Sequence, residues 1–192
     1  MQRTEDGQTV KLADYRPTDF VLHGVAMTLM LFEGHAEVAT TLTLERRAGV
    51  AADAPLVLDG DELILESIAL DGETLPPSRY AATPEQLTVT GLAESGRFEL
   101  AIGTRIAPEA NSKLMGLFRS NGIWCSQCEA EGFRRITYFL DRPDVLAPYR
   151  VRIEADRTAA PILLSNGNPV EAGDLGDLVG GELEVEKTCV LG

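Results

Sequence analysis

Two cysteines three positions apart, Cys125 and Cys128, have a spacing that could support chemistry. A C-x-x-C pair can supply half of a structural zinc site or form a redox dithiol. A zinc site needs two more ligands, and the sequence offers only His23, His35 and Cys189, with neither histidine in ligand spacing. A redox dithiol needs a β-α-β context and a helix N-terminus that lowers the thiol pKa, which the neighbouring residues do not predict. We therefore interpret both cysteines as structural or incidental and expect this chain to bind no metal.

A group of charged side chains follows the two cysteines directly in the sequence. Glu129 and Glu131 stand two residues apart and precede Arg134 and Arg135, in a stretch of small and apolar residues after Trp124. Such a segment can be a solvated loop whose surface ion pairs each contribute about 0–1 kcal/mol. It can also be a functional site, and the residues alone leave both interpretations open.

No complete catalytic motif accompanies these residues. A serine or cysteine hydrolase needs a nucleophile beside a positioned histidine, and both histidines lie near the amino end. The sequence contains no G-x-S-x-G, no H-E-x-x-H and no G-x-x-x-x-G-K-[ST] motif. We therefore expect no catalysis by this chain alone.

The composition is that of a globular, acidic protein. Of 192 residues, 44% are hydrophobic and 24% are charged, and 30 acidic against 17 basic side chains give a net charge of −13. Such a surface repels phosphate backbones and anionic lipid, so we expect neither nucleic acid nor a membrane as a partner. The first seven residues contain no apolar stretch typical of a secretory signal, and three cysteines are too few for a disulfide scaffold. These features predict a cytoplasmic protein.

The elements that must position these side chains alternate in polarity with a period of two, which is typical of half-buried strands. The alternation is clearest in residues 37–45, 97–106 and 149–156, and further strands are predicted at 20–31, 63–70, 86–90, 162–164 and 182–185. A helical period is present only around residues 129–136. The pattern predicts one all-β domain over residues 1–192, either a β-sandwich or a large curved sheet.

Turn residues fall between these runs. Asp59-Gly60, Asp71-Gly72 and Asn166-Gly167 are dipeptides that accept positive φ, so each is predicted to close a hairpin. Most of the ten prolines stand at the ends of the periodic runs, where no ladder hydrogen bond is lost.

Residues 125–146 carry a resemblance to a known family. The segment Cys-Ser-Gln-Cys-Glu-Ala-Glu-Gly-Phe-Arg-Arg-Ile-Thr-Tyr-Phe-Leu-Asp-Arg-Pro-Asp-Val-Leu is similar to the amino-terminal domain of bacterial zinc aminopeptidases of the aminopeptidase N type. Shorter stretches agree in the same order: Asp14-Tyr15-Arg16-Pro17, Ala54-Pro55-Leu56, Leu58-Asp59-Gly60, Ala110-Asn111-Ser112, Gly116-Leu117-Phe118 and Leu163-Leu164-Ser165-Asn166-Gly167-Asn168.

The resemblance implies a fold and a partner. In that family this domain is an elongated β-sandwich or saddle-shaped sheet of long antiparallel strands, which packs against a thermolysin-like catalytic domain. The H-E-x-x-H and G-x-M-E-N motifs follow it in sequence, and neither occurs here. The resemblance therefore implies no cofactor in this chain and zinc in a parent enzyme, with the parent's catalytic domain as partner. It also implies an enzyme that removes amino-terminal residues from peptides.

The resemblance implies a functional role for two residues. Glu129 matches the glutamate that helps hold the free α-ammonium of the substrate, and Gln127 matches the glutamine that lines the pocket for the first side chain. An ammonium has three donors, and a carboxylate on a rigid wall supplies a charge-assisted bond that also positions the scissile carbonyl. Glu131, Arg134 and the Asp141-Arg142-Pro143 stretch match the family pattern as well, and we interpret them as scaffold.

A rival hypothesis is a stand-alone β-sandwich that binds protein or carbohydrate without catalysis. The downstream reading frame distinguishes the two, since an H-E-x-x-H motif within about 100–150 residues, roughly one further domain, would identify the enzyme.

Overall fold

Strands dominate the computed structural model, which describes residues 11–165, 167–174 and 181–189. They are β1 (Phe20–Phe32), β2 (His35–Arg46), β3 (Leu56–Asp59), β4 (Ile64–Leu70), β5 (Glu73–Thr74), β6 (Tyr80–Thr83), β7 (Gln86–Val89), β8 (Arg97–Ile106), β9 (Gly116–Ser120), β10 (Ile123–Gln127), β11 (Ala147–Ala155), β12 (Asn168–Asp174) and β13 (Gly181–Cys189). Within these ranges, four short 3-10 turns accompany the strands: η1 (Leu12–Asp14), η2 (Pro77–Arg79), η3 (Pro108–Ala110) and η4 (Phe133–Arg135). The described ranges contain no α-helix, so the all-β prediction is confirmed.

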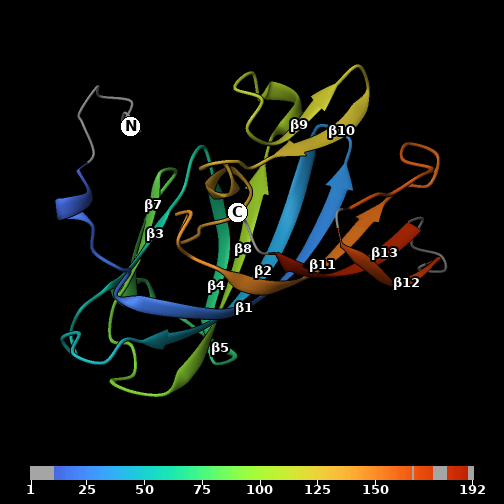
Figure 1. Cartoon of the computed structure of the whole chain (residues 1–192). Coiled ribbons are helices and arrows are strands. Elements are labelled where there is room, and N and C mark those ends of the chain that lie inside the picture. The colour runs from blue at the N-terminus through green and yellow to red at the C-terminus, as the bar shows by residue number, and fades with distance from the viewer. Residues whose placement is uncertain (1–10, 166, 175–180, 190–192) are drawn as a thin grey trace.

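One large sheet forms the body of the molecule (Figure 1). Its eight strands run in the order β12-β13-β11-β1-β2-β8-β4-β5. Neighbouring strands are antiparallel, as predicted, except that β11 lies parallel to β1, with Tyr149 opposite Val25. The period-two faces of β2 and β8 are confirmed, because their apolar positions are buried and the intervening ones are half-buried or exposed.

A three-stranded sheet, β3-β7-β6, packs against the large sheet and closes the core (Figure 1). Fully buried leucines and a valine come from both layers and belong to one core cluster: Leu42, Leu44 and Leu100 from the large sheet, and Leu56, Leu58, Leu87 and Val89 from the small one. Burying one such side chain contributes about 1.5–3 kcal/mol, so this layer contact fixes the arrangement of the sheets.

Two predicted elements are wrong. Residues 162–164 form no strand, because β13 occupies the sheet position beside β11 and Pro161 at the start of the segment has no N–H to donate. Two of its apolar side chains are instead exposed, Ile162 by 75% and Leu164 by 84%, and only Leu163 packs against the core. The helical period at 129–136 corresponds only to the 3-10 turn η4.

The predicted turns have mixed outcomes. Asp71 and Gly72 have φ of 49° and 82° and connect β4 to β5, as expected. Gly60 has no positive φ; instead Asp59 exchanges two backbone hydrogen bonds with Phe139, at 2.8 and 3.0 Å. Gly60 is needed for another reason, since a Cβ there would lie 2.7 Å from the Tyr138 ring. Asn166 lies outside the described residues.

A hairpin of β9 and β10 projects from the end of the large sheet and carries the residues of interest (Figure 1). Asn121 and Gly122, with φ of 51° and 80°, form its tight turn. The register places Gln127, the last residue of β10, opposite Gly116, the first residue of β9. No helix in the described part of the chain is long and apolar enough to cross a membrane.

Candidate functional site

The structure brings Gln127 and Glu129 together in the turn that follows β10. Both side chains are exposed, and the Gln127 amide Nε2 donates to the backbone oxygen of Glu129 at 3.4 Å. The peptide bond between Glu129 and Ala130 is cis. The two residues that the resemblance singled out therefore form one short polar edge.

This polar edge borders a groove with a volume of about 960 Å³. One wall is the β10 segment and its turn, residues 122–130, and another is the segment 159–165. The floor is formed by apolar and aromatic side chains of β1 and β11, namely Met27, Leu29, Leu31, Tyr149, Val151 and Ile153. The sequence predicted the polar edge, but the groove itself was missed, because it depends on the parallel contact between two strands more than 110 positions apart.

Aromatic packing supports the groove floor behind the turn. The rings of Phe133 and Phe139 meet edge-to-face with centroids 4.7 Å apart, and Phe133 meets Tyr149 in the same way at 5.7 Å. Such pairs add about 0.5–1.5 kcal/mol beyond their burial. The turn after Glu129 is thereby fixed to strand β11.

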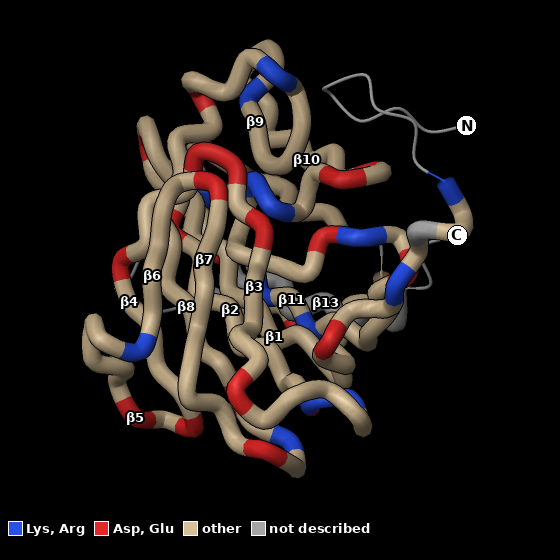
Figure 2. The backbone as a smooth tube through the Cα atoms, turned by 90° about the vertical axis from the view of Figure 1, so that its left-hand side faces the viewer, with Lys and Arg blue, Asp and Glu red and all other residues tan. Residues whose placement is uncertain are grey.

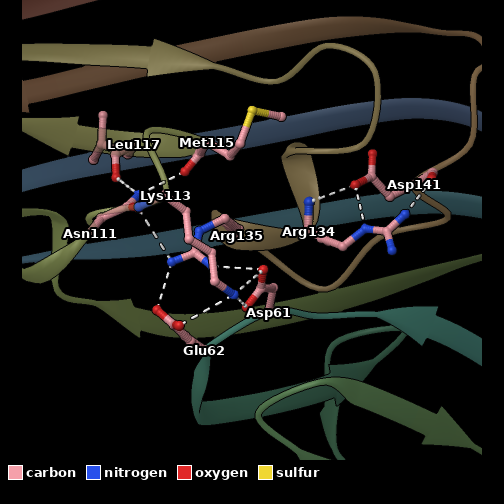
Figure 3. A network of polar contacts seen from close by, with 9 residues as sticks. All are labelled: Asp61, Glu62, Asn111, Lys113, Met115, Leu117, Arg134, Arg135 and Asp141. Carbon is pink, nitrogen blue, oxygen red and sulfur yellow. Dashed lines mark hydrogen bonds and ion pairs between the residues drawn. The ribbon is translucent and has the colours of Figure 1, made fainter. Parts of the chain in front are cut away.

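Arg134 and Asp141 clamp the same turn (Figure 3). The backbone N–H and the Nε of Arg134 donate to the Asp141 carboxylate at 3.1 and 2.8 Å, and its Nη2 donates to the Asp141 backbone oxygen at 2.9 Å. Asp141 is buried, so these charge-assisted bonds are shielded from water. Glu131 lies 3.3 Å from Arg134. These contacts agree with the interpretation of all three residues as scaffold.

Gly132 closes the turn against the end of β10. Its N–H donates to the backbone oxygen of Cys128 at 3.0 Å. A Cβ on Gly132 would lie 2.8 Å from the backbone oxygen of Gln127 and 2.9 Å from the Cα of Cys128, closer than side-chain carbons approach backbone atoms. Only glycine lets the turn fold this tightly onto Gln127.

A buried arginine cluster lies behind the turn and was not predicted (Figure 3). The Arg135 side chain is 5% exposed and forms ion pairs of 2.6 Å with both Asp61 and Glu62. Lys113 approaches the same two carboxylates at 3.0 and 3.4 Å. Adjacent acids after Asp59-Gly60 and adjacent arginines after Phe133 were visible in the sequence, but nothing in their spacing indicated that they meet.

The cluster shifts the acidities of its members. Burial alone would raise the pKa of Asp61, but hydrogen bonds from Lys113 and Arg135 outweigh it and lower the pKa below its ordinary range. The pKa of Glu62 is lowered chiefly by its hydrogen bond from Arg135. Both groups are therefore carboxylates at neutral pH.

We expect a corresponding loss of stability in acid. A carboxylate with a lowered folded-state pKa stabilises the fold fully above its unfolded pKa of about 4, and this contribution disappears as the pH falls through the folded value. Asp61→Asn should unfold at a lower urea concentration than the wild type at pH 7, because its free energy of unfolding should be lower by about 1–3 kcal/mol. The variant should also lose less stability than the wild type between pH 5 and pH 2. Urea titrations across this range provide the measurement, and parallel curves for the two proteins would contradict it.

The cysteines and histidines are placed in separate environments. Cys125 and Cys128 carry thiols rather than a disulfide, are partly exposed and border the groove. His23 contacts Glu45 at 2.7 Å, and His35 contacts Glu37 at 3.5 Å, both on the large sheet. Within the described ranges, no three His, Cys, Asp or Glu side chains are grouped so that they could hold a metal ion.

Comparisons with known proteins identify a shared domain type. The family model of the Peptidase M1 N-terminal domain matches residues 21–181. Aminopeptidase N of Caulobacter vibrioides is 47% identical over 173 residues, which cover 90% of this chain but only 20% of that protein. The chain thus spans about a fifth of that relative's length.

Two solved structures have the same fold. Aminopeptidase A of Legionella pneumophila, solved in complex with aspartic acid, superposes with a TM-score of 0.85 at 29% identity, over 93% of this chain and 21% of that one. An M1 zinc metallopeptidase from Deinococcus radiodurans superposes with a TM-score of 0.72 at 19% identity, over 88% of this chain and 39% of that one. At this second level of identity, the likeness supports the fold alone.

Proposed function

Because this chain belongs to the Peptidase M1 N-terminal domain family, we propose that it is the substrate-recognition domain of a zinc aminopeptidase. In this role it adds the α-amino anchor to an active site whose remaining parts lie in the catalytic domain of the same parent chain. The observation that carries the proposal is the exposed Glu129 carboxylate, held on a braced turn at the border of an apolar groove.

The chemistry of the turn suits an amino-terminal ligand. An ammonium group needs anionic or carbonyl acceptors, and Glu129 supplies an exposed carboxylate on a braced turn beside apolar walls. The clamp of Arg134 on Asp141 and the tight contact of Gly132 limit how far the turn can move. A carboxylate on a braced backbone loses less conformational entropy when it binds the ammonium than one on a mobile loop, and so it also orients the neighbouring carbonyl.

The groove suits a domain partner. Exposed Ile123, Ile162 and Leu164 stand on its two walls, and apolar patches of this kind are covered in most folded proteins. The length of the relatives leaves room for such a partner, since this chain covers a fifth of the Caulobacter protein. We propose that the parent's catalytic domain covers this face, that peptide amino termini bind at its border, and that the protein acts in the cytoplasm.

Zinc belongs, in this proposal, to the catalytic domain. The described residues of this chain offer no set of three metal ligands, and the sequence has no H-E-x-x-H motif. When zinc is bound there, it activates water and polarises the scissile carbonyl. The residues of this chain hold the substrate's ammonium and exclude water from one side.

We therefore expect the chain by itself to hydrolyse no peptide. Purified protein incubated with an alanyl chromogenic substrate and added zinc should release no more chromophore than a buffer blank. Turnover that survives repurification would mean that this chain contains a catalytic site of its own, and the proposal would fail.

A further inference from the structure

The Arg135 cluster contacts strand β9, which pairs with the strand that leads into the turn of Gln127 and Glu129. Gly116 is the register partner of Gln127 across the hairpin. A Cβ on Gly116 would lie only 2.5 Å from the Cβ of Arg135, so the backbone of β9 rests directly on the arginine at this point. Any shift of Arg135 therefore displaces the strand that pairs with Gln127.

Asn111 also holds this part of β9 (Figure 3). Its Nδ2 donates to the backbone oxygens of Met115 and Leu117, at 2.7 and 2.8 Å, which flank Gly116 in sequence. Its Oδ1 accepts a 3.4 Å hydrogen bond from Arg135 Nη2. The start of β9 and the guanidinium are thus parts of one hydrogen-bonded unit.

The acidic partners of Arg135 are themselves held in place. Glu62 adopts φ of 59°, a left-handed conformation that costs a residue with a side chain about 1–2 kcal/mol. The N–H of Asp61 donates to the backbone oxygen of Arg134 at 3.0 Å. The loop between β3 and β4 therefore contacts the 133–135 turn through both backbone and side chains. Figure 2 shows both acidic and basic residues along the backbone around the β9–β10 hairpin.

We propose that Arg135 is a positioning residue for the substrate ammonium: bound by Asp61 and Glu62, it holds the β9–β10 hairpin so that Gln127 and Glu129 stay at the groove. This inference rests on the proposed function. Arg135 is buried behind the hairpin and does not line the groove; its Cβ lies against Gly116, and its guanidinium acts on the start of β9 through Asn111. Its counterpart at the other side of the turn is the Arg134 clamp on Asp141, so two adjacent arginines brace the turn from two directions.

The test measures preference for the ammonium in the full-length protein that contains this chain. Leucine hydroxamate and 4-methylpentanohydroxamate differ only in the α-ammonium. The inhibition constant of 4-methylpentanohydroxamate divided by that of leucine hydroxamate therefore reports the ammonium contact alone, and this quotient is the ratio used below. Arg135→Met should lower the ratio about tenfold, since small displacements of a positioning group have effects of this size or larger. Glu62→Gln, which leaves Arg135 one carboxylate, should lower it about threefold.

A matched control separates positioning from folding. Glu66→Gln makes the same chemical change at a 2.7 Å ion pair with Arg105 on the large sheet, and it should leave the ratio unchanged. The ratio does not depend on how much enzyme is folded, because both inhibitors are measured against the same active molecules. If Arg135→Met does not fold, Glu62→Gln decides the question.

The outcomes distinguish this inference from the function on which it rests. If Glu129→Gln loses the ammonium preference while Arg135→Met and Glu62→Gln keep the wild-type ratio, Arg135 has no positioning role and the proposed function stands. If Glu129→Gln itself keeps the ratio, the proposed function is wrong.

Discussion

Replacing Glu129 with Gln in the full-length protein should lower kcat/KM for an alanyl substrate by roughly 10- to 150-fold. The amide keeps the shape of the side chain and removes its negative charge, so the ammonium loses one charge-assisted partner worth about 1.5–3 kcal/mol. The melting temperature should barely change, because the side chain is exposed and contributes little to folding. Steady-state kinetics and a thermal melt on the same preparation provide the measurement.

Glu131→Gln is the internal control for this substitution. Glu131 is also exposed, but its carboxylate faces Arg134 at 3.3 Å, within the clamp. Its replacement should therefore have a smaller effect on kcat/KM. Near-normal kinetics for Glu129→Gln together with a large loss for Glu131→Gln would mean that the anchor is misassigned. If both variants unfold, the pair is structural.

The second large effect is expected from Gly132→Ala. Gly132 has φ of −125° and ψ of −10°, which alanine also adopts, so the substitution is opposed by contacts alone. The added methyl group meets backbone atoms of Gln127 and Cys128, which cannot yield without moving the turn. We expect a loss of about 1–3 kcal/mol in the free energy of unfolding and about a 10- to 100-fold loss in kcat/KM.

Gly173→Ala tests whether these effects come from the contacts. Gly173 also lacks a positive φ, and nothing lies within 4 Å of the position that its Cβ would take. This variant should therefore match the wild type in the midpoint of urea unfolding and in kcat/KM. Equal losses for Gly132→Ala and Gly173→Ala would show that the tight turn has no special role.

Local patterns were sufficient to predict the strands that have one buried face. Val38, Leu42 and Leu44 alternate with polar residues, and all three are fully or nearly fully buried. The turn at Asp71-Gly72 was predicted for the same reason, since its dihedral requirement is local. The pattern failed at 162–164, where three apolar residues look like a strand but the adjacent sheet position is already occupied by β13.

The candidate site was predictable only in part. Gln127 and Glu129 were predicted from the resemblance of residues 125–146, and both line one groove. The groove requires the parallel pairing of β1 with β11, and the Arg135 cluster requires residues 61, 113 and 135 to converge. Such contacts depend on tertiary packing over long sequence separations, which neither composition nor periodicity encodes.

A crystal structure of the full-length protein with a bound amino acid would test whether Glu129 is the ammonium anchor. A Glu129 carboxylate oxygen should lie within about 2.7–2.9 Å of the ligand's ammonium nitrogen, the length of a charge-assisted hydrogen bond. The Gln127 side chain should lie beside the ligand's first side chain. An ammonium bound entirely by other residues, with the Glu129 carboxylate turned into solvent, would contradict this assignment.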